Sequence, residues 1–155
     1  MDILLPHTSS KKEAFAPIDY LANGRNCIEL ARLLIDGPNK IKNNYPMRVL
    51  LVHGIELLLK AFIQHFDKSM FTKRRDINKG HNIKELHRTA EEIDRSHNLN
   101  VLTDELKSAI NKVVSEYYPD SVKARYTNFN SSLDFSLFMI LKELLIQPLE
   151  KVIHL

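Results

Sequence analysis

Apolar side chains recur every three or four positions along most of this chain, which is the spacing of helices that bury one face. No stretch alternates apolar and polar residues as a half-buried strand does, and no internal repeat is present. We therefore expect helices only. Their predicted ranges are 17–36, 46–67, 83–97, 104–118 and a last helix that begins at Ser131 or Ser132.

The residues at the ends of these ranges are types that start or stop helices. Pro17 and Pro46 suit first turns, because proline lacks the N–H that a first turn leaves unpaired. The side chains of Asn82 and Thr103 can accept a hydrogen bond from the free N–H groups of the helices that follow them. Pro148 falls inside the last range, where it should kink or end the helix.

The number and spacing of these helices predict an all-α fold, an antiparallel bundle of about five helices. At 155 residues the chain is long enough to form one domain with a substantial core of its own. We expect that domain to occupy residues 16–155, and residues 1–15 to form a flexible N-terminal tail.

Composition narrows the class of protein. Apolar residues make up 44% of the chain and charged residues 26%, as in soluble globular proteins. Cys27 is the only cysteine, which excludes a disulfide framework and a thiolate metal site. The first residues lack the basic region of a signal peptide, and no uninterrupted apolar run reaches the roughly 18 residues of a membrane span. A cytoplasmic protein is expected.

The charge of the chain is mild but unevenly distributed. A net charge of +3 permits contact with nucleic acid or nucleotides without requiring it. Residues 68–79, KSMFTKRRDINK, carry five basic residues and one acid. Such a segment is either a solvated loop or a contact for phosphate groups.

The second predicted helix contains MRVLLVHGIELLLKAFI (47–63) and is apolar around most of its circumference, as expected of a central helix. Its polar side chains His53, Glu56, Lys60 and Gln64 fall within an arc of about 80° on a helical wheel. We call these four residues the polar seam. The seam is either the solvent side of the helix, with Glu56 and Lys60 paired, or a buried strip that binds a ligand or another subunit.

Three segments, in this order, resemble the HEPN family of helical nucleotide- or RNA-associated proteins. They are HGIELLLKAFI (53–63), GHNIKELHRTAEE (80–92) and YPDSVKARY (118–126). Glu56 and Lys60 match a Glu and a Lys spaced four apart on a long helix of the family. His81 matches the family's Gly-His helix start, and Arg125 with Tyr126 matches its Arg-Tyr segment. The resemblance covers roughly residues 45–145.

The resemblance implies a bundle that forms a homodimer, with a functional cleft at or near the dimer interface. Many HEPN proteins are metal-independent ribonucleases that use an Arg-x4-6-His motif. Others bind nucleotides, or act as the partner of a small nucleotidyltransferase in toxin–antitoxin and defence systems. No cofactor is implied.

The nuclease motif is incomplete at the place where the family has it. Arg125 is followed after four residues by Asn130, and an amide cannot take a proton at neutral pH as a general base must. Arg48 and His53 show the same spacing on the second helix, where they would point about 140° apart. Enzymatic activity is therefore not the leading expectation. The fallback catalytic residues are Arg48, His53, Arg75 and His81.

The other histidines suggest little chemistry. His87 and His97 lie among charged neighbours and are expected on the surface. His53 and Glu56 could offer two metal ligands on one helical face, but nothing elsewhere completes such a site, so no metal is expected. Phosphate loops rich in glycine are absent from the sequence.

The leading hypothesis is a HEPN-like homodimer that binds a nucleotide, RNA or a protein partner without catalysing a reaction. Lys60 and Arg125 would meet phosphate, Glu56 would orient them, and Tyr126 could stack on a base. The second hypothesis is a divergent ribonuclease, and the third is a structural module whose seam is an internal salt-bridge network. The predicted ligand-binding residues are His53, Glu56, Lys60, His81, Arg125 and Tyr126.

Overall fold

The computed structural model describes residues 15–36, 45–69, 82–117 and 135–153, and in these ranges every regular element is a helix. The predicted all-α class is therefore confirmed for this part of the chain. The elements are α1 (Pro17–Asp36), α2 (Tyr45–Phe66), α5 (Ile83–Ser96), α6 (Asp104–Tyr117), α8 (Phe135–Leu141), the π-helical turn η1 (Lys142–Ile146) and α9 (Gln147–Ile153).

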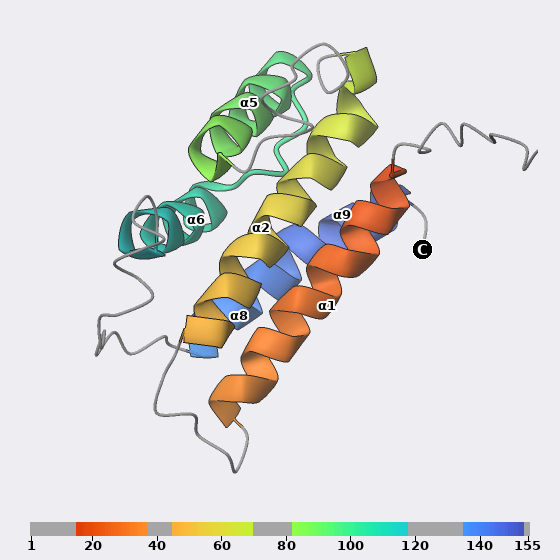
Figure 1. The fold of residues 1–155 in the computed structure, drawn as a ribbon. Coiled ribbons are helices and arrows are strands. Elements are labelled where there is room, and N and C mark those ends of the chain that lie inside the picture. Colours follow the sequence, from red (N-terminus) through yellow and green to blue (C-terminus); the bar gives the residue numbers. More distant parts are fainter. Residues whose placement is uncertain (1–14, 37–44, 70–81, 118–134, 154–155) are drawn as a thin grey trace, which may run out of the picture.

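Helix α2 lies at the centre of the bundle. It packs along α1 for most of its length and also contacts α5, α6 and α9. Figure 1 shows α5 and α6 on one side of α2, α1 on the other, and α8 and α9 passing behind the α1–α2 pair. This position explains why the second predicted helix is apolar around nearly all of its circumference.

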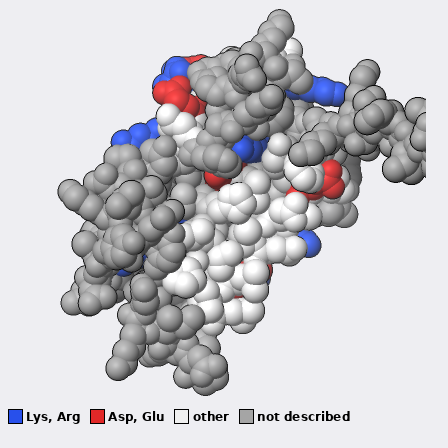
Figure 2. Space-filling view, in the orientation of Figure 1, with Lys and Arg blue, Asp and Glu red and all other residues white. Residues whose placement is uncertain are grey.

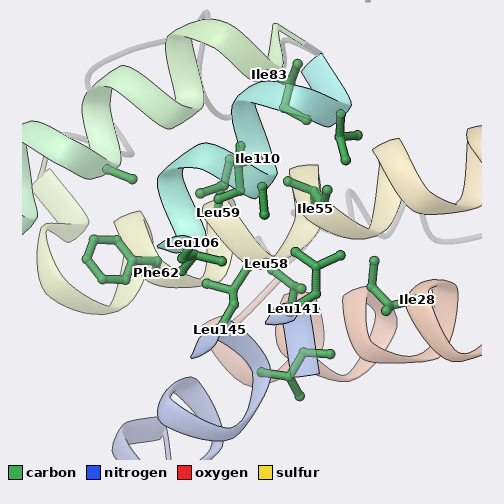
Figure 3. Packing of buried hydrophobic residues seen from close by; sticks show 14 of the residues in the cluster. Ile28, Ile55, Leu58, Leu59, Phe62, Ile83, Leu106, Ile110, Leu141 and Leu145 are labelled. Atoms are coloured by element: carbon green, nitrogen blue, oxygen red, sulfur yellow. The ribbon is translucent and has the colours of Figure 1, made fainter. Parts of the chain in front are cut away.

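The core is a single cluster to which every helix contributes. Figure 3 shows side chains from α1, α2, α5, α6, α8 and η1 converging on it. Fully burying one Leu, Ile or Phe side chain contributes about 1.5–3 kcal/mol. The members supplied by α2 that are completely inaccessible to solvent include Leu51, Ile55, Leu58, Leu59, Phe62 and Ile63.

Helices α1 and α2 touch at two glycines, Gly24 and Gly54. A Cβ placed on Gly24 would lie 2.9 Å from Leu58 Cγ and 3.0 Å from the Gly54 carbonyl oxygen. A Cβ placed on Gly54 would lie 2.7 Å from Ile28 Cδ1 and 3.1 Å from the Gly24 carbonyl oxygen. Glycine inside a helix costs about 1 kcal/mol relative to alanine, so this close approach explains why glycine is found at both positions.

The two predicted N-caps are confirmed. Asn82 Oδ1 accepts a hydrogen bond from the Glu85 N–H at 3.3 Å, and Thr103 Oγ1 accepts one from the Leu106 N–H at 3.2 Å. Helices α5 and α6 therefore begin within a residue of where the sequence predicted. The ends of α1 and α2, at Asp36 and Phe66, also agree with the predicted ranges to within one residue.

Of the two outcomes expected at Pro148, a kink or an end of the helix, the end does not occur. The predicted start at Ser131 or Ser132 lies outside the described residues. From Phe135 the chain remains helical past Pro148 to Ile153. Because proline lacks an N–H and its ring crowds the carbonyl four residues earlier, an α-helical turn cannot continue there unchanged. The turn before it is π-helical, with the Gln147 N–H donating to the Lys142 carbonyl, five residues back.

By length and composition alone, Pro46–Phe66 of α2 could cross a membrane. Core helices of globular proteins pass the same test, and 61% of its most apolar stretch is buried inside the bundle. In the described part of the chain one such helix says little about a membrane location.

Candidate functional site

The polar seam on α2 is mostly buried. The exposed fractions of Glu56, Lys60 and Gln64 are 5%, 4% and 7%, whereas the side chain of His53 is 46% exposed. The interpretation of the seam as the solvent side of α2 is therefore wrong for three of its four members. The seam begins at the surface with His53, and its other three residues lie between packed helices.

Glu56 and Lys60 form a buried ion pair one helical turn apart. Lys60 Nζ donates to Glu56 Oε1 at 2.8 Å, and their side chains are 6% and 7% exposed. Removing two charges from water is expensive, and a buried pair returns that cost only when its geometry is good and its remaining hydrogen-bonding groups are satisfied. The ammonium carries three N–H donors. Within the described ranges, Glu56 is its one hydrogen-bonding partner.

Glu56 also lies close to His53. His53 Nδ1 is 3.6 Å from Glu56 Oε2, the oxygen that does not bind Lys60. A protonated imidazole at this distance is attracted to the carboxylate, and a neutral one needs only a small movement to donate to it. The carboxylate thus links an exposed imidazole to a buried ammonium.

Helix α1 adds Tyr20, which the sequence analysis did not single out. Burial raises the pKa of the Tyr20 phenol, and the negative charge of Glu56 raises it further. In an antiparallel pair that meets at Gly24 and Gly54, Tyr20 lies one turn from the contact on α1, level with the turn between Glu56 and Lys60 on α2. In the sequence, the two glycines were the signal for the close contact that places Tyr20 beside the seam. That signal can be interpreted only when it is known that α1 packs against α2.

Gln64 anchors the buried end of the seam. Its Nε2 donates to the Phe15 carbonyl at 2.8 Å, which ties α2 to the residues just before α1. The Phe15 ring also meets the Tyr20 ring edge-on, with the ring centroids 5.7 Å apart. Gln64 therefore has a structural role at its end of the seam, where it binds the backbone of Phe15.

The fallback catalytic pair on α2 is split between two environments. Arg48 is 4% exposed, whereas nearly half of the His53 side chain is in solvent. The other predicted site residues cannot be placed. Arg75, His81, Arg125, Tyr126 and Asn130 lie outside the described residues, as does nearly all of the basic segment 68–79.

His87 is the clearest error of the sequence analysis. It was expected on the surface, but only 6% of it is exposed, whereas His97 at the end of α5 is exposed as expected. The signal was present, because position 87 is four after the buried Ile83 and three before the buried Ala90. The charged neighbours of His87 obscured that helical spacing.

The charges on the surface are unevenly placed. Figure 2 shows a broad area without charged residues over α1 and the adjoining part of α2. Leu30 and Leu33 of α1 and Val49 of α2 are 51%, 53% and 45% exposed. On another side of α1, Arg25 Nη1 pairs with Glu150 Oε1 of α9 at 3.0 Å.

Comparison with known proteins gives no identification, because no family model, curated protein or solved structure matches this chain. Within the described residues there is also no group of three or more His, Cys, Asp or Glu side chains that could hold a metal ion.

Proposed function

We propose that this chain is a HEPN-like helical module that binds a nucleotide, RNA or a protein partner through the polar seam, without catalysing a reaction itself. The observation that carries this proposal is the buried Glu56–Lys60 pair, which the exposed His53 connects to the surface. A toxin–antitoxin or defence role and a cytoplasmic location belong to the same proposal and follow from the sequence resemblance.

The chemistry of Lys60 supports a ligand that carries phosphate. Its ammonium is a compact charge with donors beyond the one given to Glu56, and phosphate oxygens accept several such bonds. Glu56 holds the ammonium in place, and His53 can add a second donor at the entrance. Arg125 and Tyr126, in the segment that matches the family's Arg-Tyr element, would supply a second phosphate contact and a stacking surface. His81 would contribute at the helix start that follows the basic segment.

The charge-free surface over α1 and α2 supports a homodimer. Two copies of a chain with net charge +3 repel each other least where neither presents charge. Leu30, Leu33 and Val49 would provide the apolar contact. Sedimentation of Leu30→Glu/Leu33→Glu, compared with Ser108→Glu on the exposed side of α6, tests this. Dissociation by both variants, or by neither, would argue against this surface.

Binding of a short fluorescently labelled single-stranded RNA, and of ATP, tests the main proposal. Lys60→Met should abolish the change in anisotropy or the binding heat, and so should Glu56→Leu/Lys60→Met, in which no unpaired charge remains buried. Lys112→Met, which removes an exposed lysine from α6, should change affinity little beyond the loss of one screened charge. Equal loss in Lys60→Met and Lys112→Met would contradict a site at the seam. If the folded wild type binds neither probe, the seam is an internal structural network.

A second candidate function, a divergent metal-independent ribonuclease, is favoured by one contact. The 3.6 Å approach of His53 Nδ1 to Glu56 Oε2 would hold the imidazole and leave its other nitrogen as a base for the ribose hydroxyl. Cleavage of a mixed single-stranded RNA pool without added metal tests it. Loss in His53→Ala or His81→Ala, but not in His65→Ala on the exposed side of α2, would support a nuclease and overturn the binding proposal.

A further inference from the structure

His87 lies in an open hollow between α5 and α6, away from the polar seam. The hollow has a volume of about 380 Å³. It is lined by Lys84, His87, Arg88, Glu91, Asn111, Val114 and Ser115. None of these residues belongs to α2, so the hollow is independent of the site proposed above.

The imidazole of His87 is buried but incompletely paired. Its Nε2 is inaccessible to water, and no hydrogen-bond partner for it lies within the described residues. The nearest opposite charge is Glu91 Oε1, one turn further along α5, at 3.8 Å. That distance is too long for a hydrogen bond but short enough to attract an added proton.

The groups around His87 favour its neutral form. Burial lowers the pKa of His87 most strongly, and the positive charge of Lys107 on α6 lowers it as well. Glu91 and a hydrogen bond to Asn111, both of which raise the pKa of His87, act in the opposite direction without reversing the result. On α5, Glu85 and Glu92 form ion pairs with Arg88. Glu91 is therefore the carboxylate of α5 that can stabilise a positive charge on the imidazole.

The position of α5 and α6 in the bundle allows a positive charge on His87 to move these two helices. Both helices rest on α2, and α6 also contacts α8, whereas α1 and α2 are held together along most of their length. Figure 1 shows α5 and α6 on the outer side of α2. A helix pair at the edge can open locally while the rest of the protein stays folded.

We propose that His87 is a proton-sensitive switch, so that proton uptake by its imidazole drives local opening of α5 and α6 away from α2. The sign follows from linkage. An exposed histidine ionises near its ordinary pKa of about 6.5, and the buried His87 only at lower pH. Protons therefore bind the open form more tightly, and opening increases as pH falls below about 6.5. Glu91 limits the effect, because it stabilises the charged imidazole in the closed form.

Amide hydrogen exchange of the full chain tests this proposal, with protection factors corrected for the intrinsic pH dependence of exchange. Between about pH 7.5 and about pH 5.5 the protection of α5 and α6 should fall relative to that of α1 and α2. The fall is up to about tenfold for each pH unit by which the closed and open pKa values of His87 differ. NMR of the His87 ring in the same samples reports proton uptake directly.

Substitutions separate His87 from other sources of acid sensitivity. His87→Leu should remove the acid response, and Glu91→Gln should enlarge it by removing the counter-charge. Glu92→Gln is the matched control on α5, and His97→Gln is the control for an exposed histidine; both should respond as the wild type does. An unchanged protection ratio in the wild type, or an acid response that persists in His87→Leu, would overturn the proposal. If His87→Leu does not fold, equal responses of Glu91→Gln and Glu92→Gln would overturn it instead.

Discussion

Gly24 and Gly54 face each other across the contact of α1 and α2, so closely that a Cβ on either would lie 3.0–3.1 Å from the carbonyl oxygen of the other. This contact sets the position of Tyr20 relative to the polar seam. Both glycines are inside helices, where alanine would be the better helix former by about 1 kcal/mol. The packing of the two helices, and not local preference, therefore explains these residues.

Alanine at Gly24 should destabilise the protein. The added Cβ would meet the branched carbon of Leu58 and also the Gly54 backbone, which cannot move without shifting a helix. Overpacking costs about 1–3 kcal/mol, which exceeds the gain of about 1 kcal/mol in helix propensity. Urea unfolding measures the net loss. Asn23→Ala, at the exposed neighbouring position, should be neutral or slightly stabilising, and equal behaviour of the two variants would contradict the close contact.

The ion pair of the seam predicts a non-additive pair of substitutions. Lys60→Met leaves the Glu56 carboxylate buried without its ammonium, and breaking a buried pair in this way costs about 3–5 kcal/mol. The double variant Glu56→Leu/Lys60→Met removes both charges and should recover most of that loss. Denaturant unfolding of both single variants and the double variant gives the coupling energy.

An exposed pair on α5 provides the control for this cycle. Arg88 and Glu92 are also four residues apart, with side chains 52% and 45% exposed. Solvent screening makes the contribution of such a pair small. If the cycle at Glu56 and Lys60 gives a coupling no larger than the cycle at Arg88 and Glu92, the seam pair is solvated in solution, and the argument for a buried site fails.

The helices could be predicted from the sequence, because their signals are local, whereas the burial of the seam was one of two alternatives that the sequence left open. Asn82 and Thr103 precede apolar helical patterns, and a helix apolar on nearly all sides must be central. The contributions of Gly24 and Tyr20 could not be predicted, because they depend on which helices pair and at what level. At Pro148 the sequence predicted a kink or an end without deciding between them, because no single residue type indicates the π-helical turn that precedes it.

Tyr20 makes the electrostatics of the seam measurable at high pH. An unfolded tyrosine ionises near pH 10, whereas burial and then the charge of Glu56 raise the pKa of Tyr20 above that value. The resulting stabilisation is fully present below about pH 10 and is lost as pH rises through the higher pKa of the folded state. Glu56→Gln should lower the pKa of Tyr20, as followed by NMR of the labelled ring. Glu143→Gln, an exposed change on η1, should not lower it, and a similar effect of both variants would show that Glu56 does not act on Tyr20 directly.

Asp94 should be the most sensitive residue of the connection between α5 and α6. Its Oδ1 accepts hydrogen bonds from the Val101 N–H at 2.9 Å and the Leu102 N–H at 3.4 Å, and only 8% of the residue is exposed. Hydrogen bonds to a charged group contribute about 1.5–3 kcal/mol, and Asp94→Ala would also leave two N–H groups unpaired. We expect a loss of about 2–3 kcal/mol in the free energy of unfolding.

Two further variants show whether the loss at Asp94 comes from these hydrogen bonds. Asp94→Asn keeps an acceptor oxygen and should recover part of the stability, because a neutral acceptor forms the same bonds more weakly. Asp104→Ala, at a fully exposed position in the first turn of α6, should cost little, since it removes only screened interactions with the helix dipole and with Lys107, whose Nζ lies 3.9 Å from Asp104 Oδ1. If Asp94→Asn is as unstable as Asp94→Ala, the charge of Asp94 holds the connection in place. If Asp94→Ala costs no more than Asp104→Ala, the turn between α5 and α6 is held by its buried apolar residues, such as Leu102, and not by the carboxylate.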